Sequence, residues 1–206
     1  MAEVLGIPSL FGTGLGLAAG AGLNAYAVLL VYGSLARFFP GEFPGVLAGV
    51  LSTTPALSAF GVLYLLEFFA DKIPGLDHVW DLLHSVVRPL AGAFLALAAV
   101  EPGTDSLPLQ IVATGSGGLV ALLSHLLKSA ARVTSTALTA GVANAALSFA
   151  EDVVAFLQAL VSVFLPLVAL ATVAGMTVLF LLTVPRLARR TNLLGRHRPK
   201  ESVSPP

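Results

Sequence analysis

The chain has 206 residues, of which 56% are hydrophobic and 11% are charged, and its mean hydropathy is +0.91. A soluble domain is roughly 25% charged, so this composition excludes an ordinary water-soluble fold and predicts a membrane protein. The net charge of zero and the single Trp argue against a nucleic-acid-binding surface. Because the chain has no Cys, it has neither disulfides nor a Cys nucleophile.

The apolar stretches predict an all-α polytopic membrane protein with about six spans. The first covers about residues 9–38, and the second begins at 52–55, where hydroxyls can cap the helix and Pro55 suits its first turn. The third ends near Val100, and the fourth covers about 109–131. The stretch 149–184 would be about 54 Å long as one helix, more than a hydrocarbon core of about 30 Å, so we divide it at Pro166.

Basic residues gather after the last apolar stretch and predict the orientation. They are Arg186, Arg189, Arg190, Arg196, Arg198 and Lys200, against Glu201, a net of +5. By the positive-inside rule the C-terminus is predicted to be cytoplasmic, and with six spans the N-terminus is predicted to be cytoplasmic too. We therefore expect one transmembrane domain, residues 1–190, and a disordered basic tail, residues 191–206, that rests on anionic lipids.

Two pairs of opposite charge lie at similar predicted depth. Glu67 and Asp71 share one face of the second span, and Lys128 and Arg132 share one face of the fourth. A charge at membrane depth costs roughly 2.5–3.5 kcal/mol, so we expect the four residues to pair with one another. The network is either structural or a gate or relay for ions or protons.

Asn24 follows a run of glycines, Gly12, Gly16 and Gly20, that falls on one helical face. This spacing favours close helix packing. The alternative is that Gly14, Gly20, Gly22 and Asn24 mark a broken segment that lines a polar site, as in many transporters.

Between the second and third spans, a polar stripe is formed by Asp77, Asp81, His84 and Arg88. With apolar residues opposite and Trp80 nearby, it predicts a helix that lies in the headgroup plane or packs under the bundle. The stripe lacks a complete set of metal ligands, so we expect neither a metal nor a cofactor.

Later polar residues allow two interpretations each. Ser148 and Glu151 fit a capping box that starts the fifth span, but if that helix begins earlier, Asn144, Ser148 and Glu151 share a polar face. His125 is either a helix-contact histidine or a proton carrier.

Several segments resemble the bacterial membrane family known as domain of unknown function 4126. They are residues 22–26 (GLNAY), 67–77 (EFFADKIPGLD), Trp80-Asp81 and 88–92 (RPLAG), then Gly117-Gly118, Lys128, Arg132, Glu151-Asp152 and Pro166. The resemblance covers about residues 10–185. It implies a small polytopic inner-membrane protein, and it does not imply any particular activity.

Two internal repeats can be drawn. An offset of 95 matches Gly20, Gly22 and Ser34 with Gly115, Gly117 and Ser129, which would give a 3+3 inverted repeat. A rival parallel alignment places Glu67, Asp71 and Arg88 on Lys128, Arg132 and Glu151, with every charge reversed. We prefer the inverted repeat, because its identities accumulate along one helix without gaps.

These patterns favour a transporter or channel for a small solute or ion. The candidate pathway residues are Asn24, Glu67, Asp71, Lys128, Arg132 and Glu151. The alternative is a noncatalytic membrane module that binds lipid or a partner protein, either of which could be a homo-oligomer. We do not expect an enzyme, because the sequence has no nucleophile elbow, Walker loop or HExxH motif. An intramembrane enzyme is the third hypothesis.

Overall fold

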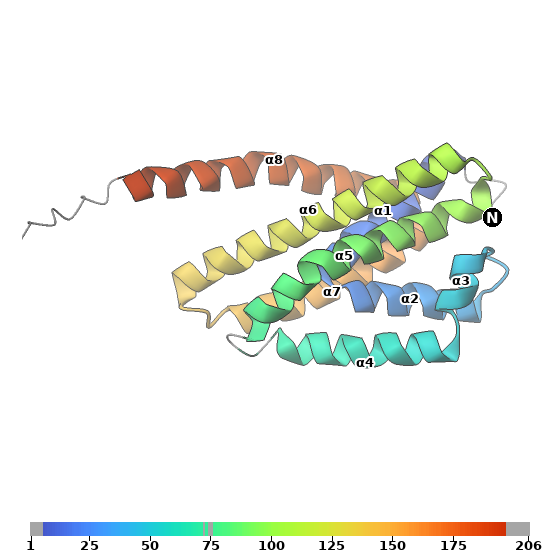
Figure 1. Cartoon of the computed structure of the whole chain (residues 1–206), viewed down its shortest axis with the longest axis horizontal. Coiled ribbons are helices and arrows are strands. Elements are labelled where there is room, and N and C mark those ends of the chain that lie inside the picture. The colour runs from blue at the N-terminus through green and yellow to red at the C-terminus, as the bar shows by residue number, and fades with distance from the viewer. Residues whose placement is uncertain (1–5, 72, 74–75, 197–206) are drawn as a thin grey trace, which may run out of the picture.

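The computed structural model describes residues 6–71, 73 and 76–196, and only the backbone for residues 7, 76–79 and 184–196. The described chain is helical, which confirms the predicted all-α class (Figure 1). Its elements are α1 (Ile7–Leu23), α2 (Ala25–Phe38), α3 (Val46–Leu51), α4 (Thr54–Ala70), α5 (Leu76–Val100), the 3-10 turn η1 (Glu101–Gly103), α6 (Leu107–Thr139), α7 (Asn144–Phe164) and α8 (Pro166–Arg196).

The first predicted span is a broken helix. Asn24 has an extended backbone (φ −148°, ψ 104°), so the helix stops at Leu23 and starts again at Ala25. The two arms then fold back on each other, because Leu10 near the start of α1 and Leu35 near the end of α2 line the same cavity. A single crossing over residues 9–38 is therefore wrong, and the broken segment at Asn24 is confirmed. We call this unit the α1–α2 hairpin.

Helix α1 is the centre of the bundle and packs against α5, α6, α7 and α8. Its glycine face allows this contact: a side chain at Gly12 would meet the Pro166 backbone of α8, and one at Gly16 would meet Ser162 of α7. The predicted close packing of this face is thus confirmed. Small residues let helix backbones approach where lipid-like surroundings give no hydrophobic drive for association.

From α4 to α8 the helices run alternately in opposite directions (Figure 1). Four segments are long and apolar enough to cross a membrane: Trp80–Gly103, Leu107–Thr139, Asn144–Phe164 and Pro166–Thr183. Two shorter apolar helices, Ala25–Phe38 and Thr54–Ala70, accompany them. The predicted caps and breaks at α4 and α8 are confirmed, since Thr53 accepts from the amide of Ala56 at 3.4 Å and α8 begins at Pro166.

The two ends of the bundle hold different parts of the chain. At one end, here the N-terminal end, α1 begins, α2 ends and η1 lies; at the other, the C-terminal end, lie the turn between α6 and α7 and the end of α8 (Figure 1). Because the α1–α2 hairpin returns to its starting end, the beginning of α1 and the end of α8 lie at opposite ends. This arrangement differs from the predicted even number of crossings. Which end faces the cytoplasm stays a prediction.

Three predicted boundaries need correction. Helix α5 is continuous from Leu76 to Val100, so the expected headgroup-plane helix and the third span are one element despite Pro89. Helix α7 begins at Asn144, so Ser148 and Glu151 lie inside the helix and do not form its capping box. Residues 191–196 continue α8, and residues 197–206 of the predicted tail lie outside the described chain.

The inverted-repeat alignment pairs unlike structures. It matches residues 20–37, which contain the break at Asn24, with residues 115–132, which are one uninterrupted part of α6. By contrast, the α4–α5 and α6–α7 hairpins run in the same two directions, as the rival parallel alignment requires (Figure 1). Neither repeat is established by this comparison, but the direction of the hairpins agrees with the parallel one.

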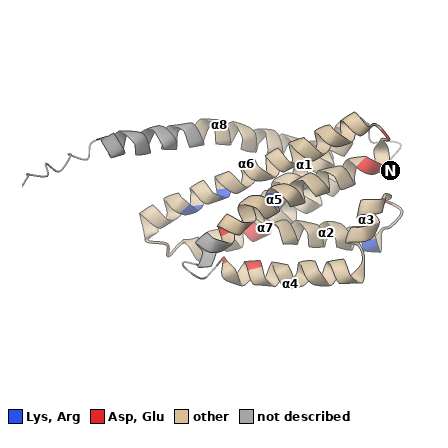
Figure 2. Cartoon of the chain, in the orientation of Figure 1, with Lys and Arg blue, Asp and Glu red and all other residues tan. Residues whose placement is uncertain are grey.

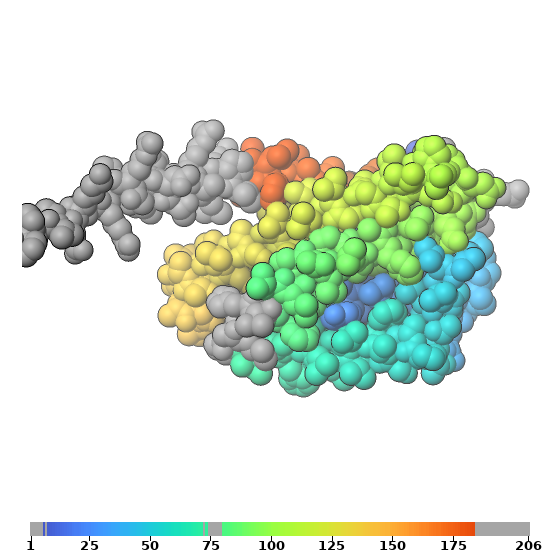
Figure 3. Space-filling model, viewed as in Figure 1, coloured from blue at the N-terminus to red at the C-terminus, as the bar shows by residue number. Residues whose placement is uncertain are grey.

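The outer surface is apolar, as a lipid-facing surface is. Large exposed side chains include Val62 of α4, Leu119 of α6 and Leu181 of α8. Figure 3 shows the surface hollowed between α4 and α5, where atoms of the blue α1–α2 hairpin are visible. In α4 only Glu67 and Ala70 are buried, and its N-terminal half contacts the bundle through Leu57 beside Gly33 and through Phe60, which packs on the core.

Candidate functional site

Charged side chains of four helices converge inside the bundle. Figure 2 shows the acidic and basic segments of α4, α5, α6 and α7 in the part of the bundle toward the C-terminal end. We define the buried charge network as Glu67, Asp71, Asp81, His84, Arg88, His125, Lys128, Arg132, Glu151 and Asp152. All are buried except Asp81, whose side chain is 16% exposed.

The network meets the α1–α2 hairpin at its vertex. Asn24 caps α2 by accepting from the amide of Ala27 at 2.9 Å, and its side-chain Nδ2 donates to Asp152 Oδ1 at 2.9 Å. On the other arm, Lys128 Nζ donates to the carbonyl of Leu23 at 2.9 Å. An acid thus lies near the positive N-terminal end of α2, and a base lies at the negative C-terminal end of α1. Both signs suit the helix dipoles.

One lobe of the network is centred on Asp71. Its Oδ2 accepts from Lys128 Nζ at 3.0 Å and from Arg132 Nη2 at 2.6 Å. Glu151 Oε2 lies 2.9 Å from Arg132 Nη2 and 3.4 Å from Lys128 Nζ. The pairing of Asp71 with Lys128 and Arg132 is therefore confirmed, and the two bases of α6 join α4 to α7.

A second lobe is centred on Arg88, and it corrects two predictions. Glu67 Oε1 accepts from Arg88 Nη2 at 2.7 Å, so Glu67 pairs with α5 and not with Lys128 or Arg132. His84 and Arg88 are fully buried, so they do not face lipid headgroups as the polar stripe predicted. The physical reason is that a buried Glu67 needs a cation within reach, and Arg88 is that cation. The side chain of Asp77 lies outside the described residues.

Two further contacts complete this lobe. His125 Nδ1 lies 2.6 Å from Arg88 Nη1, which makes His125 a helix-contact histidine. Asp81 lies between the lobes, since its carboxylate oxygens are 3.7 Å from Arg88 Nη1 and 3.6 Å from Arg132 Nη1. Nine of the ten residues are therefore connected by these contacts, and Asp152 binds Asn24 at the vertex of the hairpin.

Two members of the network lie at similar depth along their helices. Glu67 is about 20 Å along α4 from its start at Thr54, and Arg88 is about 18 Å along α5 from Val100. Both helix ends are at the N-terminal end of the bundle, and a hydrocarbon core is about 30 Å thick. A charge at membrane depth is costly unless it is paired, and these two residues pair with each other.

The structure brings all six predicted pathway residues together and adds others. Asp81, His84 and Arg88 were missed as members because they were assigned to the polar stripe, and Asp152 was named only in the family resemblance. Their spacing in the sequence fits an interfacial polar face and a helix start equally well, so it did not distinguish them as members. Asn144, by contrast, donates to Thr136 Oγ1 at 2.8 Å in the turn between α6 and α7, outside the network.

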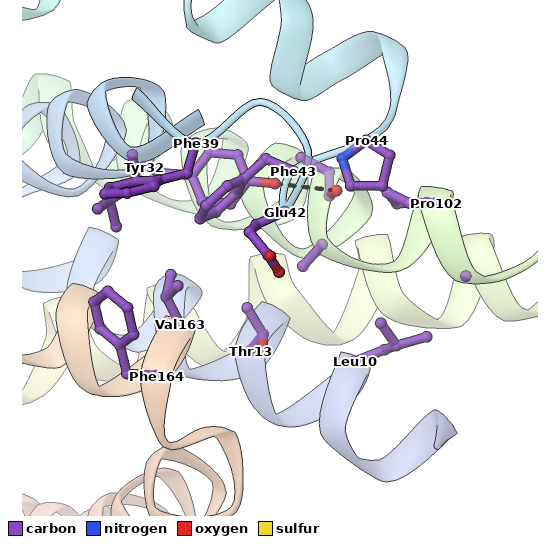
Figure 4. A pocket seen from close by; sticks show the side chains of 14 residues that line it. Leu10, Thr13, Tyr32, Phe39, Glu42, Phe43, Pro44, Pro102, Val163 and Phe164 are labelled. Atoms are coloured by element: carbon purple, nitrogen blue, oxygen red, sulfur yellow. Dashed lines mark hydrogen bonds between the residues drawn. The ribbon is translucent and has the colours of Figure 1, made fainter. Parts of the chain in front are cut away.

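Two hollows lie against the α1–α2 hairpin, one toward each end of the bundle. A cavity of about 290 Å³ opens at the N-terminal end; in Figure 4, Glu42 lies between Phe43 and Thr13 on its walls. A groove of about 870 Å³ runs between α6, α7 and α8 toward the C-terminal end. The groove is lined by Leu23, Lys128 and Glu151, so it reaches the vertex of the hairpin.

Comparison with known proteins identifies the family. Among the described residues, no group of His, Asp and Glu is arranged to hold a metal ion. No curated protein and no solved structure matches the chain. The family described as Domain of unknown function (DUF4126) matches residues 11–186, which include the α1–α2 hairpin and every member of the buried charge network, and the chain belongs to this family.

Proposed function

We propose that this protein is a transporter or channel for a small solute or ion. The observation that carries the proposal is the break at Asn24, which lies in the bundle interior with Asp152 and Lys128 bound at its two sides. Discontinuous helices near the midplane are the binding elements of many secondary transporters, because their free ends offer partial charges to a solute.

The two hollows support the same proposal. The 290 Å³ cavity lies between the open arms of the α1–α2 hairpin, and the 870 Å³ groove reaches its vertex from the other end. A solute that crosses the bundle needs access to one central site from both ends. The hairpin separates the hollows, so a movement of its vertex would change which hollow reaches the network.

A flux assay tests the proposal. The full chain in liposomes would be offered a panel of monovalent cations, anions, amino acids and sugars, and uptake would be compared with empty liposomes. We expect uptake of at least one solute, and its loss in Asn24→Ala and Glu67→Gln. Arg37→Gln is the matched control, because Arg37 lies at the N-terminal end, where it contacts Ser52 and Thr54.

A second candidate function is a noncatalytic module that binds lipid. The 870 Å³ groove between α6, α7 and α8 favours the lipid-binding module. The groove is lined by apolar side chains such as Leu127 and Leu138, and by the charged Lys128. That combination suits an acyl chain and an anionic headgroup. If wild-type protein moves no solute in the panel but co-purifies with lipid that Leu138→Asn removes, the lipid-binding module replaces the transporter.

A further inference from the structure

The two buried histidines of the network differ in their hydrogen bonds. His125 Nδ1 is 2.6 Å from Arg88 Nη1, and a guanidinium only donates, so Nδ1 accepts and carries no hydrogen. Its Nε2 then donates to Ser85 Oγ at 3.2 Å, and Ser85 donates to the carbonyl of Asp81 at 3.1 Å. These contacts hold His125 as a neutral imidazole.

His84 has the opposite arrangement. Its Nδ1 is 2.8 Å from the carbonyl of Trp80, which only accepts, so Nδ1 carries the hydrogen of the neutral ring. Its Nε2 is buried and, within the described part of the chain, makes no hydrogen bond. The nearest charged atom across from it is Glu67 Oε1 at 3.8 Å, and Glu67 Oε2 also lacks a hydrogen-bond donor there. Two acceptors thus face each other in a fully buried space.

The charge of the network also favours an added proton. Its five carboxylates are Glu67, Asp71, Asp81, Glu151 and Asp152, and its three permanent cations are Arg88, Lys128 and Arg132. Four of these carboxylates, Glu67, Asp71, Asp81 and Glu151, contact the three cations, so with both imidazoles neutral this set has one more negative than positive charge. An excess of charge in a membrane interior is costly, so a bound cation or proton lowers the free energy of the network.

We propose that His84 and Glu67 form a proton-binding site, and that the proton is the coupling ion of the proposed transport. The proton adds to His84 Nε2, the new N–H donates to Glu67 Oε1, and the imidazole becomes a cation. Coupling rests on the proposed function, whereas proton uptake does not. The groups that face His84 are Tyr26 of α2, Glu67 of α4, Arg88 of α5, and His125 and Lys128 of α6.

Proton uptake would reach the hairpin through Arg88. A cationic His84 competes with Arg88 for Glu67 Oε1, and the nearest alternative carboxylate for Arg88 is Asp81, at 3.7 Å. Asp81 also faces Arg132, which shares Asp71 with Lys128, the donor to the carbonyl of Leu23. One proton at His84 therefore changes the pairing along a chain of charges that ends at the vertex of the hairpin.

The sole Trp of the chain, Trp80, reports directly on this site. Its ring centroid is 5.2 Å from that of His84, and a protonated imidazole in contact with an indole quenches its fluorescence. The full-length chain in lipid nanodiscs, with His78→Gln and His197→Gln to remove the other two histidines, would be titrated from about pH 8 to about pH 5. We expect Trp80 emission to fall on acidification.

Three variants test which residue takes up the proton that changes Trp80 emission. His84→Gln should abolish the change in emission, His125→Gln should retain it, and Glu67→Gln should move its midpoint down by about one pH unit or more, because an opposite charge is lost. Nitrogen-15 NMR of the histidine rings in the unsubstituted chain gives a second readout that needs no folded variant. Emission and ring signals that stay constant across the range would overturn the proposal, and so would a transition that His125→Gln removes.

Flux measurements separate this proposal from the proposed function. A solute flux that a pH gradient drives, and that His84→Gln uncouples from that gradient, supports both. Titration of His84 in a protein that moves no solute retains the proton site and rejects transport. If flux does not depend on the pH gradient and His84 does not titrate, the proton site is rejected and transport is retained.

Discussion

Lys128 donates to the backbone carbonyl of Leu23 and to Asp71 at the same time, at 2.9 and 3.0 Å. The carbonyl at the end of α1 has no helical partner, and the bundle interior offers it no bulk water. One ammonium group therefore satisfies the broken helix and the carboxylate of α4 together. As a consequence, any change in the ion pairs of Asp71 is transmitted to the point where the α1–α2 hairpin turns.

Removing Lys128 should therefore destabilise the fold strongly. In Lys128→Met, the carboxylates of Asp71 and Glu151 lose a cation and the Leu23 carbonyl loses its donor, and we expect a loss of about 3–5 kcal/mol. Thermal unfolding of purified protein in detergent would measure this loss. Arg37→Met is the control, because Arg37 is exposed and its contacts are to a hydroxyl and a carbonyl. Equal melting temperatures for the two variants would contradict the buried role of Lys128.

A charge swap should identify the partner of Glu67. Glu67→Arg or Arg88→Glu alone places like charges 2.7 Å apart in the interior, whereas the double variant restores an ion pair of opposite polarity. We expect the double variant to recover much of the stability lost in each single variant. Glu67→Lys combined with Lys128→Glu is the comparison, and it should be no more stable than its worse single variant. The reverse ranking would show that Glu67 pairs with α6.

The sequence predicted the helices and the charge cluster better than it predicted the connections. Apolar length and charged residues at one depth were enough to indicate the spans from α4 to α8 and the pairing of Asp71 with Lys128. The partner of Glu67 was missed because Arg88 precedes a proline and lies four residues from His84, a spacing that also fits a headgroup-plane helix. A three-dimensional contact was needed to decide between these alternatives.

The α1–α2 hairpin also could not be predicted from the local sequence alone. Glycines and one Asn in an apolar run are compatible with a packed helix and with a broken one, and both features are present: Gly12 and Gly16 pack, and Asn24 breaks. Asp152, more than a hundred positions later, binds the Asn24 side chain, and no local pattern predicts that contact. The return of α2 to its starting end followed from this break.

Close packing on α1 should make Gly16 intolerant of even a methyl group. A Cβ at Gly16 would be 2.6 Å from the Ala169 Cβ and would also meet the Ser162 hydroxyl, so α1 would have to move away from α7 and α8. We expect Gly16→Ala to cost about 1–3 kcal/mol. Gly115→Ala is the matched control, because nothing lies within 4 Å of its Cβ and alanine favours the helix by about 0.5–1 kcal/mol. Equal stability of the two variants would exclude the close approach.

The hairpin makes a prediction about topology that single cysteines can test, since the natural chain has none. Gly6, Glu42 and Asp105 all lie at the N-terminal end of the bundle, whereas Val142 lies in the turn at the C-terminal end and is 83% exposed. We expect an impermeant thiol reagent added outside intact cells to label Gly6→Cys, Glu42→Cys and Asp105→Cys, and to label Val142→Cys only after the cells are opened. The basic residues between 186 and 200 predict that the C-terminal end is inside, and the expected direction of labelling follows from that prediction. If Gly6→Cys were labelled only after the cells are opened, as Val142→Cys is, while Glu42→Cys was labelled from outside, α1 and α2 would cross the membrane once as a single span, and the return at Asn24 would be wrong.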